Sequence, residues 1–494
     1  MKTTQIIIAT LLFIFYCITT EAKDYNVKNF GAKGDGLTLD SPAIQSAINV
    51  CTENGGGRVI IPPGKYISST IQLKNNVTLF IEKNAEILGI TDPTQYKNVD
   101  PFVDGTGQSR GCALITAVDA KNIGLEGKGE INGRGTQLIM SDGKKMPSAL
   151  RPFLLRIVRC EGVTIKDVFL KSSAAWTTHF FESRKILIEG IKIHSVGMGN
   201  NDGIDIDCSS DIIIKNCDIE TGDDAVCFKT TASKLPCKNI QVSGMRLKSN
   251  HAGIKFGTES MAPFEDIKIK DCYIYDTRNG GIKILAVDGA KLRNVEISDI
   301  KMDNVRTAIL MRLGARLKVY RKDLDEKQPI GCMENIVIKN VEAIIDRNTQ
   351  HKYPSAILIT GIPEHNITNV TLDNFTIWLA GGAPASETDI EIPEAIDAYP
   401  EISTFGPRMP SYLVWARHAK NLNIKNIKVT LEKPDMRPAL FFEDINGIHL
   451  NAIQIPDTGN KEKQADIILN NCEGLSASSK LIKNIRIKTY EKRK

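Results

Sequence analysis

Aromatic residues and charge of one sign are both scarce in this chain. Phe, Trp and Tyr together make up 6% of its 494 residues, a low value for a carbohydrate-binding module, in which sugars stack on aromatic rings. There are 63 basic and 58 acidic residues, which leaves a formal net charge of +5. Because this small excess is spread along the chain, it indicates a mixed surface, and we expect no nucleic acid partner.

Long apolar runs are absent after the first twenty residues. Lys2 precedes an apolar run at residues 6–18, and small residues follow up to Ala22. This order is typical of a secretory signal peptide, and the run is too short for a comfortable membrane span. We expect a signal peptide at residues 1–22 and a mature chain at 23–494 that is secreted or periplasmic, spans no membrane and is monomeric. Cys17 suggests a lipoprotein anchor, but the bulky Tyr16 before it argues against lipidation.

Cysteine pairs of the CxxC type are missing, although the chain has eleven cysteines. Their absence argues against a zinc site, and we expect neither a metal nor another cofactor. Most of the cysteines lie inside apolar segments, as Cys208, Cys217 and Cys272 do. The simplest interpretation is a set of buried free thiols. Export would permit disulfides, whose pairing the sequence leaves open.

A short phrase recurs along the chain: a turn residue, an alternating apolar strand and a polar stop. From Ile186 onward the strand centres fall at Ile212, Ile240, Ile267 and Val295, in steps of 26, 28, 27 and 28 residues. This alternation has the period of a strand and not that of a helix. One unit cannot bury its own apolar face, so the units must stack. The repeat predicts an all-β fold, a single-stranded right-handed parallel β-helix, because the LxxLxL pattern of a leucine-rich repeat is absent.

The residues that follow position 23 predict a cap on this solenoid. A Gly-rich turn precedes a helix that Asp40 or Ser41 can cap, with Pro42 at its first position. An uncovered solenoid end would expose the core and unpaired strand edges, so we expect the helix to cover it. Two stretches, 314–328 and 381–410, break the repeat and are expected to be loops. No linker interrupts residues 23–494, which predicts one domain.

The strongest local signal lies between Gly199 and Thr231. It contains NNDGID at residues 200–205 and GDD at residues 222–224. Together with the FGAKGDG and IPPGKY segments near the start, these motifs resemble family 28 of the glycoside hydrolases, the polygalacturonases and rhamnogalacturonan hydrolases. The resemblance covers nearly the whole mature chain. It implies a secreted glycosidase that cleaves α-glycosidic bonds of pectic polysaccharide with inversion of configuration.

The three aspartates of these motifs are the candidate catalytic residues. Asp202 and Asp223 lie 21 residues apart, a little under one coil, so a β-helix places them on adjacent rungs. Clustering raises the pKa of at least one carboxyl group, and glycoside hydrolysis needs both an acid and a carboxylate. The resemblance implies that Asp224 is the general acid and that Asp202 and Asp223 hold and deprotonate the water. Turn formation or a calcium site is the alternative, and Asp205 and Asp207 are interpreted as turn or supporting groups.

The chain departs from the family's pattern on the next two coils. Where the family has GHG, this sequence has Ala252 in place of the His, and Lys283 stands at the Arg position of the family's RIK motif. His251 comes one residue early, so it either stacks under Asp223 or misses the site. Lys255 and Lys283 are 28 residues apart and should stack on one face, toward the substrate's carboxylate or the aspartates, unless both are solvated. These departures favour exo action or a rhamnogalacturonan substrate over plain endo-polygalacturonase activity.

Neighbouring coils supply further substrate-binding candidates beside His251, Lys255 and Lys283. Trp176 could stack on a sugar face, or it could be a core residue, and His179 could bind a hydroxyl group. Arg312 and Arg417 could line the groove, and Tyr399 could form a wall of a subsite.

Two other functions stay open. A polysaccharide lyase of the same fold would need a calcium cluster and a strongly basic Lys or Arg, and Lys255 and Lys283 keep that possibility alive. A non-catalytic β-helix that adheres to glycans is the second. Reaction products separate these functions, because a lyase forms an unsaturated uronide and an adhesin releases no reducing ends.

Overall fold

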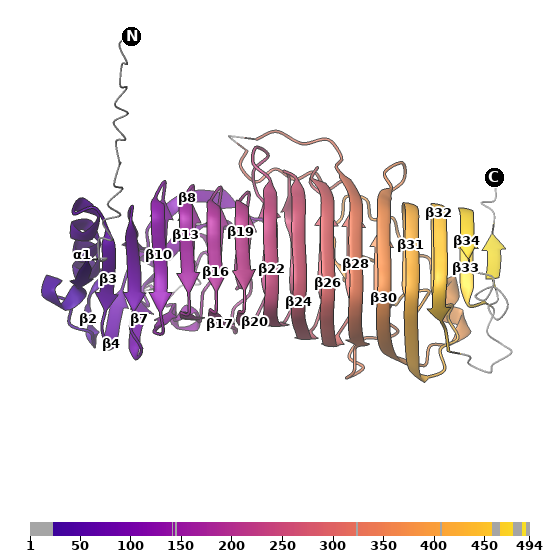
Figure 1. Cartoon of the computed structure of the whole chain (residues 1–494), viewed down its shortest axis with the longest axis horizontal. Coiled ribbons are helices and arrows are strands. Elements are labelled where there is room, and N and C mark those ends of the chain that lie inside the picture. Colours follow the sequence, from indigo (N-terminus) through magenta and orange to yellow (C-terminus); the bar gives the residue numbers. More distant parts are fainter. Residues whose placement is uncertain are drawn as a thin grey trace, which may run out of the picture.

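The computed structural model describes residues 23–140, 142–143, 146–322, 325–405, 408–456, 465–477 and 487–490. The expected signal peptide and Cys17 lie outside these residues. The described chain forms a right-handed parallel β-helix, as the repeat predicts. Its coils stack along the long axis of the molecule, with the N-terminal coils at one end and the C-terminal coils at the other (Figure 1).

Three stacks of parallel strands form the walls of the solenoid. The first stack carries the recurring phrase, and it consists of β1 (Asp24–Asn26), β3 (Gly57–Ile61), β6 (Val77–Ile81), β10 (Lys121–Gly127), β13 (Glu161–Lys166), β16 (Arg184–Glu189), β19 (Ser210–Lys215), β22 (Cys237–Ser249), β24 (Phe264–Thr277), β26 (Lys291–Val305), β28 (Cys332–Ile345), β30 (Ile367–Gly381), β31 (Val414–Lys433), β32 (Leu440–Gln454) and β34 (Glu473–Ala477). The second stack begins with β2 (Asp35–Leu39), β4 (Gly64–Ser68), β7 (Ala85–Gly89), β11 (Glu130–Asn132), β14 (Phe169–Lys171), β17 (Lys192–Ser195) and β20 (Asp218–Thr221). From β22 onward, long strands serve both stacks, since β22 pairs with β19 and with β20.

The third stack positions the candidate site. It consists of β5 (Ile71–Gln72), β9 (Ser109–Val118), β12 (Phe153–Val158), β15 (Thr178–Phe181), β18 (Ile204–Asp207), β21 (Val226–Thr230), β23 (Ala252–Ser260), β25 (Gly280–Ala286), β27 (Ile309–Leu313) and β29 (Ile357–Thr360), followed by the first residues of β31 and β32 and by β33 (Ile467–Asn470) and β35 (Ile487–Tyr490). One strand, β8 (Asn98–Val103), pairs antiparallel with β9 and forms a hairpin with it.

The register of the first stack confirms the coil spacing found in the sequence. Ile186 pairs with Ile212, Ile212 with Ile240, and Ile240 with Ile267. These side chains belong to one continuous buried core that runs the length of the solenoid. Alternation along each strand therefore sends apolar side chains inward and polar ones outward, as expected for strands with one buried face.

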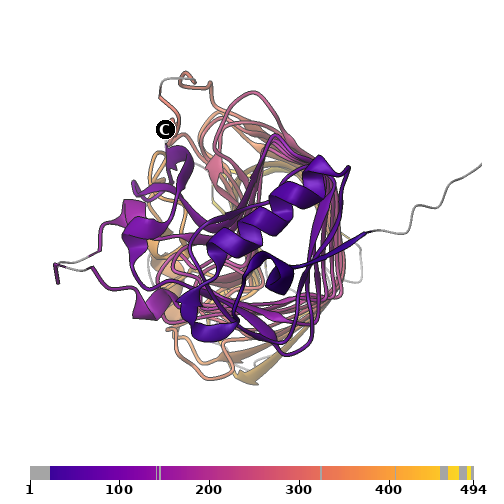
Figure 2. The same cartoon turned by 90° about the vertical axis from the view of Figure 1, so that its left-hand side faces the viewer.

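Helix α1 (Ser41–Glu53) lies across the N-terminal end of the solenoid (Figure 2). Its buried residues pack into the core and confirm the predicted cap. The expected side-chain cap at the helix start is wrong. The Asp40 carboxylate instead accepts hydrogen bonds from the backbone N–H groups of Lys33 and Gly34, and the Ser41 hydroxyl lies 2.9 Å from that of Ser69.

The remaining elements are short and lie in the connections between strands. The 3-10 turns are η1 (Val27–Phe30), η2 (Pro93–Gln95), η3 (Gly135–Gln137), η4 (Ser148–Leu150), η5 (Ala385–Asp389) and η6 (Ile402–Phe405). The ten cysteines in the described part of the chain are free thiols, and eight of them are buried. Among the described residues, no helix has the length and apolar character needed to cross a membrane.

Candidate active site

The outer face of the third stack holds the candidate residues. Asp205 of β18 pairs with Cys227 of β21, Cys227 with Lys255 of β23, and Lys255 with Lys283 of β25. The motif aspartates lie in the turns that lead into these strands. Asp202 precedes β18, and Asp223 and Asp224 precede β21. The outward side chains of the strands therefore form one row along the stack, and the three aspartates of the turns lie beside this row.

The three aspartates converge as the motif spacing predicts. One carboxylate oxygen of Asp202 and one of Asp224 lie within 4.8 Å of each other, with the Cys227 sulfur within the same distance. Oxygens of Asp223 and Asp224 also lie within 4.8 Å of each other, beside a ring nitrogen of His251. Asp202 and Asp224 are almost fully buried, and Asp223 is slightly more open.

The glycines of the two motifs lie where a Cβ atom would clash with a neighbouring residue. A Cβ atom on Gly203 would lie 2.4 Å from the carbonyl oxygen of Ala225 on the next coil. A Cβ atom on Gly222 would lie 2.4 Å from the amide oxygen of Asn201. Such distances are far inside van der Waals contact, so a side chain at either position would have to displace its neighbour.

Asp224 is held as an anion. Its Oδ2 accepts a 2.7 Å hydrogen bond from the Lys255 ammonium, and its Oδ1 accepts one of 3.0 Å from the backbone N–H of Ala252. Burial works against ionisation, but the charges of Lys255 and Lys283 outweigh it and hold the pKa of Asp224 well below its usual range. This arrangement argues against the acid role that the family resemblance implies for Asp224.

Asp223 has the environment of a proton donor. Burial, followed by the charge of Asp224, raises the pKa of Asp223 above its usual range. His251 lies beside Asp223, with its Nδ1 atom 3.7 Å from Asp223 Oδ1. The side-chain amide nitrogen of Asn279 is within hydrogen-bond distance of the same ring nitrogen, at 3.3 Å. Of the two outcomes left open for His251, the structure therefore shows the one that brings it to the site.

Lys229 is the main site residue that sequence reasoning missed. Its ammonium lies 3.4 Å from carboxylate oxygens of Asp202, Asp205 and Glu259 and 4.3 Å from the centre of the Trp176 ring. Burial raises the pKa of Asp202 to about 7 even with this ammonium nearby. The signal was present in the sequence, because alternation along β21 puts Cys227 and Lys229 on the same outer face.

The two lysines expected to stack do so, and each meets a carboxylate of the chain. Lys255 and Lys283 are register partners on β23 and β25. Lys255 binds Asp224, whereas the Lys283 ammonium is fully buried and donates a hydrogen bond to Glu401. Neither lysine is a solvated surface group.

Trp176 and His179 lie beneath the site. Trp176 is buried against Phe102 and Phe153, under the Lys229 ammonium. Of its two possible roles, sugar stacking or core packing, the structure shows core packing. His179 is fully buried and bridges Arg156 and Asp207. Burial lowers the pKa of His179 to about 4, so the ring is neutral near pH 7.

Arg312 and Arg417 hold the loop between β30 and β31. Both guanidinium groups are buried and donate to carbonyl oxygens of residues 392–395. Tyr399, from the same loop, is 38% exposed, and its hydroxyl accepts a 2.9 Å hydrogen bond from Thr258 on β23. Apolar residues of the loop pack against β25, β27, β29 and β31, and the loop brings Tyr399 to the edge of the site.

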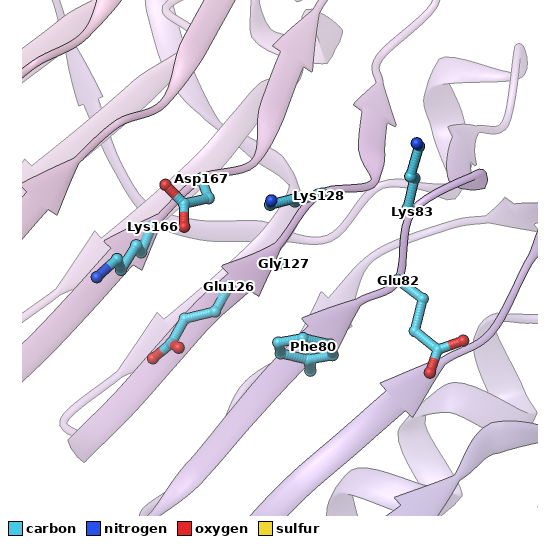
Figure 3. Close-up of a pocket in the computed structure, with 8 residues that line it drawn as sticks. All are labelled: Phe80, Glu82, Lys83, Glu126, Gly127, Lys128, Lys166 and Asp167. Carbon is cyan, nitrogen blue, oxygen red and sulfur yellow. The ribbon is translucent and has the colours of Figure 1, made fainter.

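A hollow of about 540 Å³ elsewhere on the solenoid shares no residue with this site. It lies over β6, β10 and β13 of the first stack, where Phe80 is flanked by Glu82 and Glu126 (Figure 3). Three acids and three lysines line it, so their charges cancel. The carboxylate chemistry of the chain is located on the third stack instead.

Comparison with known proteins identifies the family. The model of Glycosyl hydrolases family 28 matches residues 51–394. The chain is 26% identical over 398 residues to a probable polygalacturonase of Vitis vinifera, with 76% of this chain and 79% of that protein covered. It is 25% identical over 426 residues to an exo-poly-alpha-D-galacturonosidase of Dickeya chrysanthemi, with 75% of this chain and 70% of that protein covered.

A solved structure has the same fold. The exopolygalacturonase of Thermotoga maritima aligns with a TM-score of 0.64 at 21% identity and covers 83% of this chain and 93% of that one. The family model spans well over half of the sequence, and it includes both aspartate motifs. The chain is therefore a polygalacturonase-like glycosidase and belongs to family 28 of the glycosyl hydrolases.

Proposed function

We propose that this chain is an exported, monomeric, exo-acting hydrolase that cleaves α-glycosidic bonds of pectic polysaccharide with inversion of configuration. The observation that carries the proposal is the convergence of three carboxylates with different electrostatic environments around one position. The relatives named above are a probable polygalacturonase and an exo-poly-alpha-D-galacturonosidase, which supports a pectic substrate.

The environments assign a role to each aspartate. Asp223, whose pKa is raised, protonates the leaving glycosidic oxygen. Asp202 and Asp224 hold the attacking water between them, because one water can donate hydrogen bonds to two oxygens that lie within 4.8 Å of each other. Asp202, whose pKa of about 7 suits a base, accepts the proton that this water loses as it attacks the anomeric carbon. Asp202 Oδ1 is buried without a hydrogen-bond partner in the described chain, as expected of a group that binds water or substrate.

Inversion is supported by the state of Asp224. Both of its oxygens already accept hydrogen bonds from the chain, which makes it a poor nucleophile. The Asp223 and Asp224 oxygens lie closer together than the carboxyl separation of about 6.5–9.5 Å that is typical of inverting enzymes. The anomeric configuration of the first product decides between inversion and retention. Inversion gives the β-anomer from an α-linked substrate, and retention gives the α-anomer.

Exo action is supported by a wall beside Asp202. The connection between β8 and β9 reaches the NNDGID turn, where the Gln108 amide donates a 2.9 Å hydrogen bond to Asn200. Arg151 donates to the Gln108 side chain and to the carbonyl oxygen of Ala174. Gly105 in the same connection donates to Glu259 at 2.6 Å, so the connection is fixed beside the site.

Product analysis tests this proposal. Homogalacturonan and rhamnogalacturonan oligomers are incubated with the enzyme, with and without EDTA, and products are followed by chromatography, near-ultraviolet absorbance and NMR. We expect saturated products released one unit at a time from a chain end, with EDTA having no effect. Unsaturated uronides and loss of activity with EDTA would establish a lyase, and glycan binding without reducing ends would establish an adhesin.

A further inference from the structure

The lysines on the outer face of the site are all neutralised by the chain itself. Lys229 is surrounded by three carboxylates, and Lys255 is bound to Asp224. Lys283, one rung further along, has a fully buried ammonium that donates to Glu401. This row therefore presents no free cation to a substrate.

Glu401 is held in place by the loop between β30 and β31. Tyr399, two residues earlier, accepts a hydrogen bond from Thr258, and the backbone N–H of Glu401 donates to the Tyr399 carbonyl oxygen at 2.9 Å. Arg312 and Arg417 anchor residues 392–395 of the same loop. The loop is thus attached to β23 through Tyr399 and to β27 and β31 through the two arginines. These attachments fix the position of Glu401 in the site.

A second cation, Arg306, lies within the electrostatic influence of Glu401. Arg306 is half-buried, donates a 3.4 Å hydrogen bond to the Asn279 amide oxygen, and lies in the field of the Glu401 and Asp346 carboxylates. Lys283 is thus paired with Glu401, and the charge of Glu401 also acts on Arg306. A uronate carboxylate placed here would meet Glu401 as a like charge, in a partly buried setting where water screens poorly.

We propose that Glu401 makes the subsite beside Lys283 selective for an uncharged sugar unit. Two sources share this chemistry: a neutral sugar that alternates with uronate, and a uronate whose carboxyl group is methyl-esterified. The inference rests on the proposed hydrolase function and names its substrate class more closely. Glu401 is a specificity-determining residue and takes no part in proton transfer.

Matched substrates test this role. Oligogalacturonides of one length are prepared as the free acid and as the methyl ester, together with rhamnogalacturonan oligomers, and kcat/KM is measured for each. We expect the wild type to favour an uncharged substrate over the free acid at least tenfold. Which of the two uncharged substrates is faster identifies the source.

Substitution of Glu401 isolates its charge. Glu401→Gln keeps an acceptor for Lys283 and removes the negative charge, so the preference should move at least tenfold toward the free acid. Glu387→Gln is the control, because Glu387 lies in the same inter-strand connection and pairs with Arg408; its preference should equal that of the wild type. Lys283→Met leaves Glu401 unpaired and should increase discrimination against the free acid.

The outcomes separate this inference from the function on which it rests. An unchanged preference in Glu401→Gln, or a wild type that favours the free acid, overturns the role of Glu401 while hydrolysis stands. Absence of reducing ends from every substrate overturns the hydrolase itself. Circular dichroism of each variant verifies its fold, and Lys283→Met supplies the reverse shift if Glu401→Gln does not fold.

Discussion

Replacing Asp202 by Asn should stabilise the protein at alkaline pH. Burial raises the pKa of Asp202 from 3.8 to about 7. Between these values the folded chain keeps a proton that the unfolded chain has lost, so the stability contributed by Asp202 falls as pH rises through this window and reaches its minimum above pH 7. Each tenfold change in proton affinity is worth about 1.4 kcal/mol, which gives a cost on the order of 4 kcal/mol above pH 7. Asn has no charge and removes this cost.

Urea unfolding followed by tryptophan fluorescence measures the effect. At pH 4 the wild type and Asp202→Asn should unfold at similar urea concentrations, because Asp202 is then protonated and resembles Asn. At pH 8 the variant should unfold at a clearly higher concentration. Asp271→Asn, an exposed change on β24, is the control and should match the wild type at both values. A variant that is less stable than the wild type at pH 8 would refute the reasoning, because the Lys229–Asp202 attraction would then outweigh the cost of burial.

Two further predictions concern pH and metal ions. Lys229→Met should move the acidic limb of kcat/KM to higher pH, because Asp202 loses its nearest ammonium and binds its proton more tightly, whereas Lys229→Arg should keep the wild-type limb. A loss of rate that is equal at every pH would instead assign Lys229 a purely structural role. Incubation with EDTA should leave the rate unchanged, because the carboxylates of the site are already balanced by Lys229 and Lys255; a loss that calcium restores would contradict this.

The features that the sequence predicts well are those that repeat. The spacing of Ile186, Ile212 and Ile240 predicts the coils, and the observed register matches it. The same spacing brings Asp202 beside Asp224 and stacks Lys255 on Lys283. Side chains on successive coils occupy equivalent places in a solenoid, so their proximity follows from position alone.

The features that the sequence does not predict come from segments outside the repeat. Glu401 and Gln108 reach the site from loops, and no period relates them to the strands they contact. Alternation places Arg312 and Arg417 on the outer face, but it cannot show that a loop covers them. The protonation state of Asp224 depends on its hydrogen-bonded ion pair with Lys255, and a motif match gives no information about this contact.

The central claim is that Asp202, Asp223 and Asp224 act together on one glycosidic bond. The most direct measurement is the rate at which Asn variants of each aspartate release reducing ends from pectic oligomers at the pH optimum of the wild type. The account predicts that each single variant, folded by circular dichroism, loses at least about a hundredfold in kcat, the scale of acid–base catalysis. Wild-type rates in any one of the three variants would contradict it.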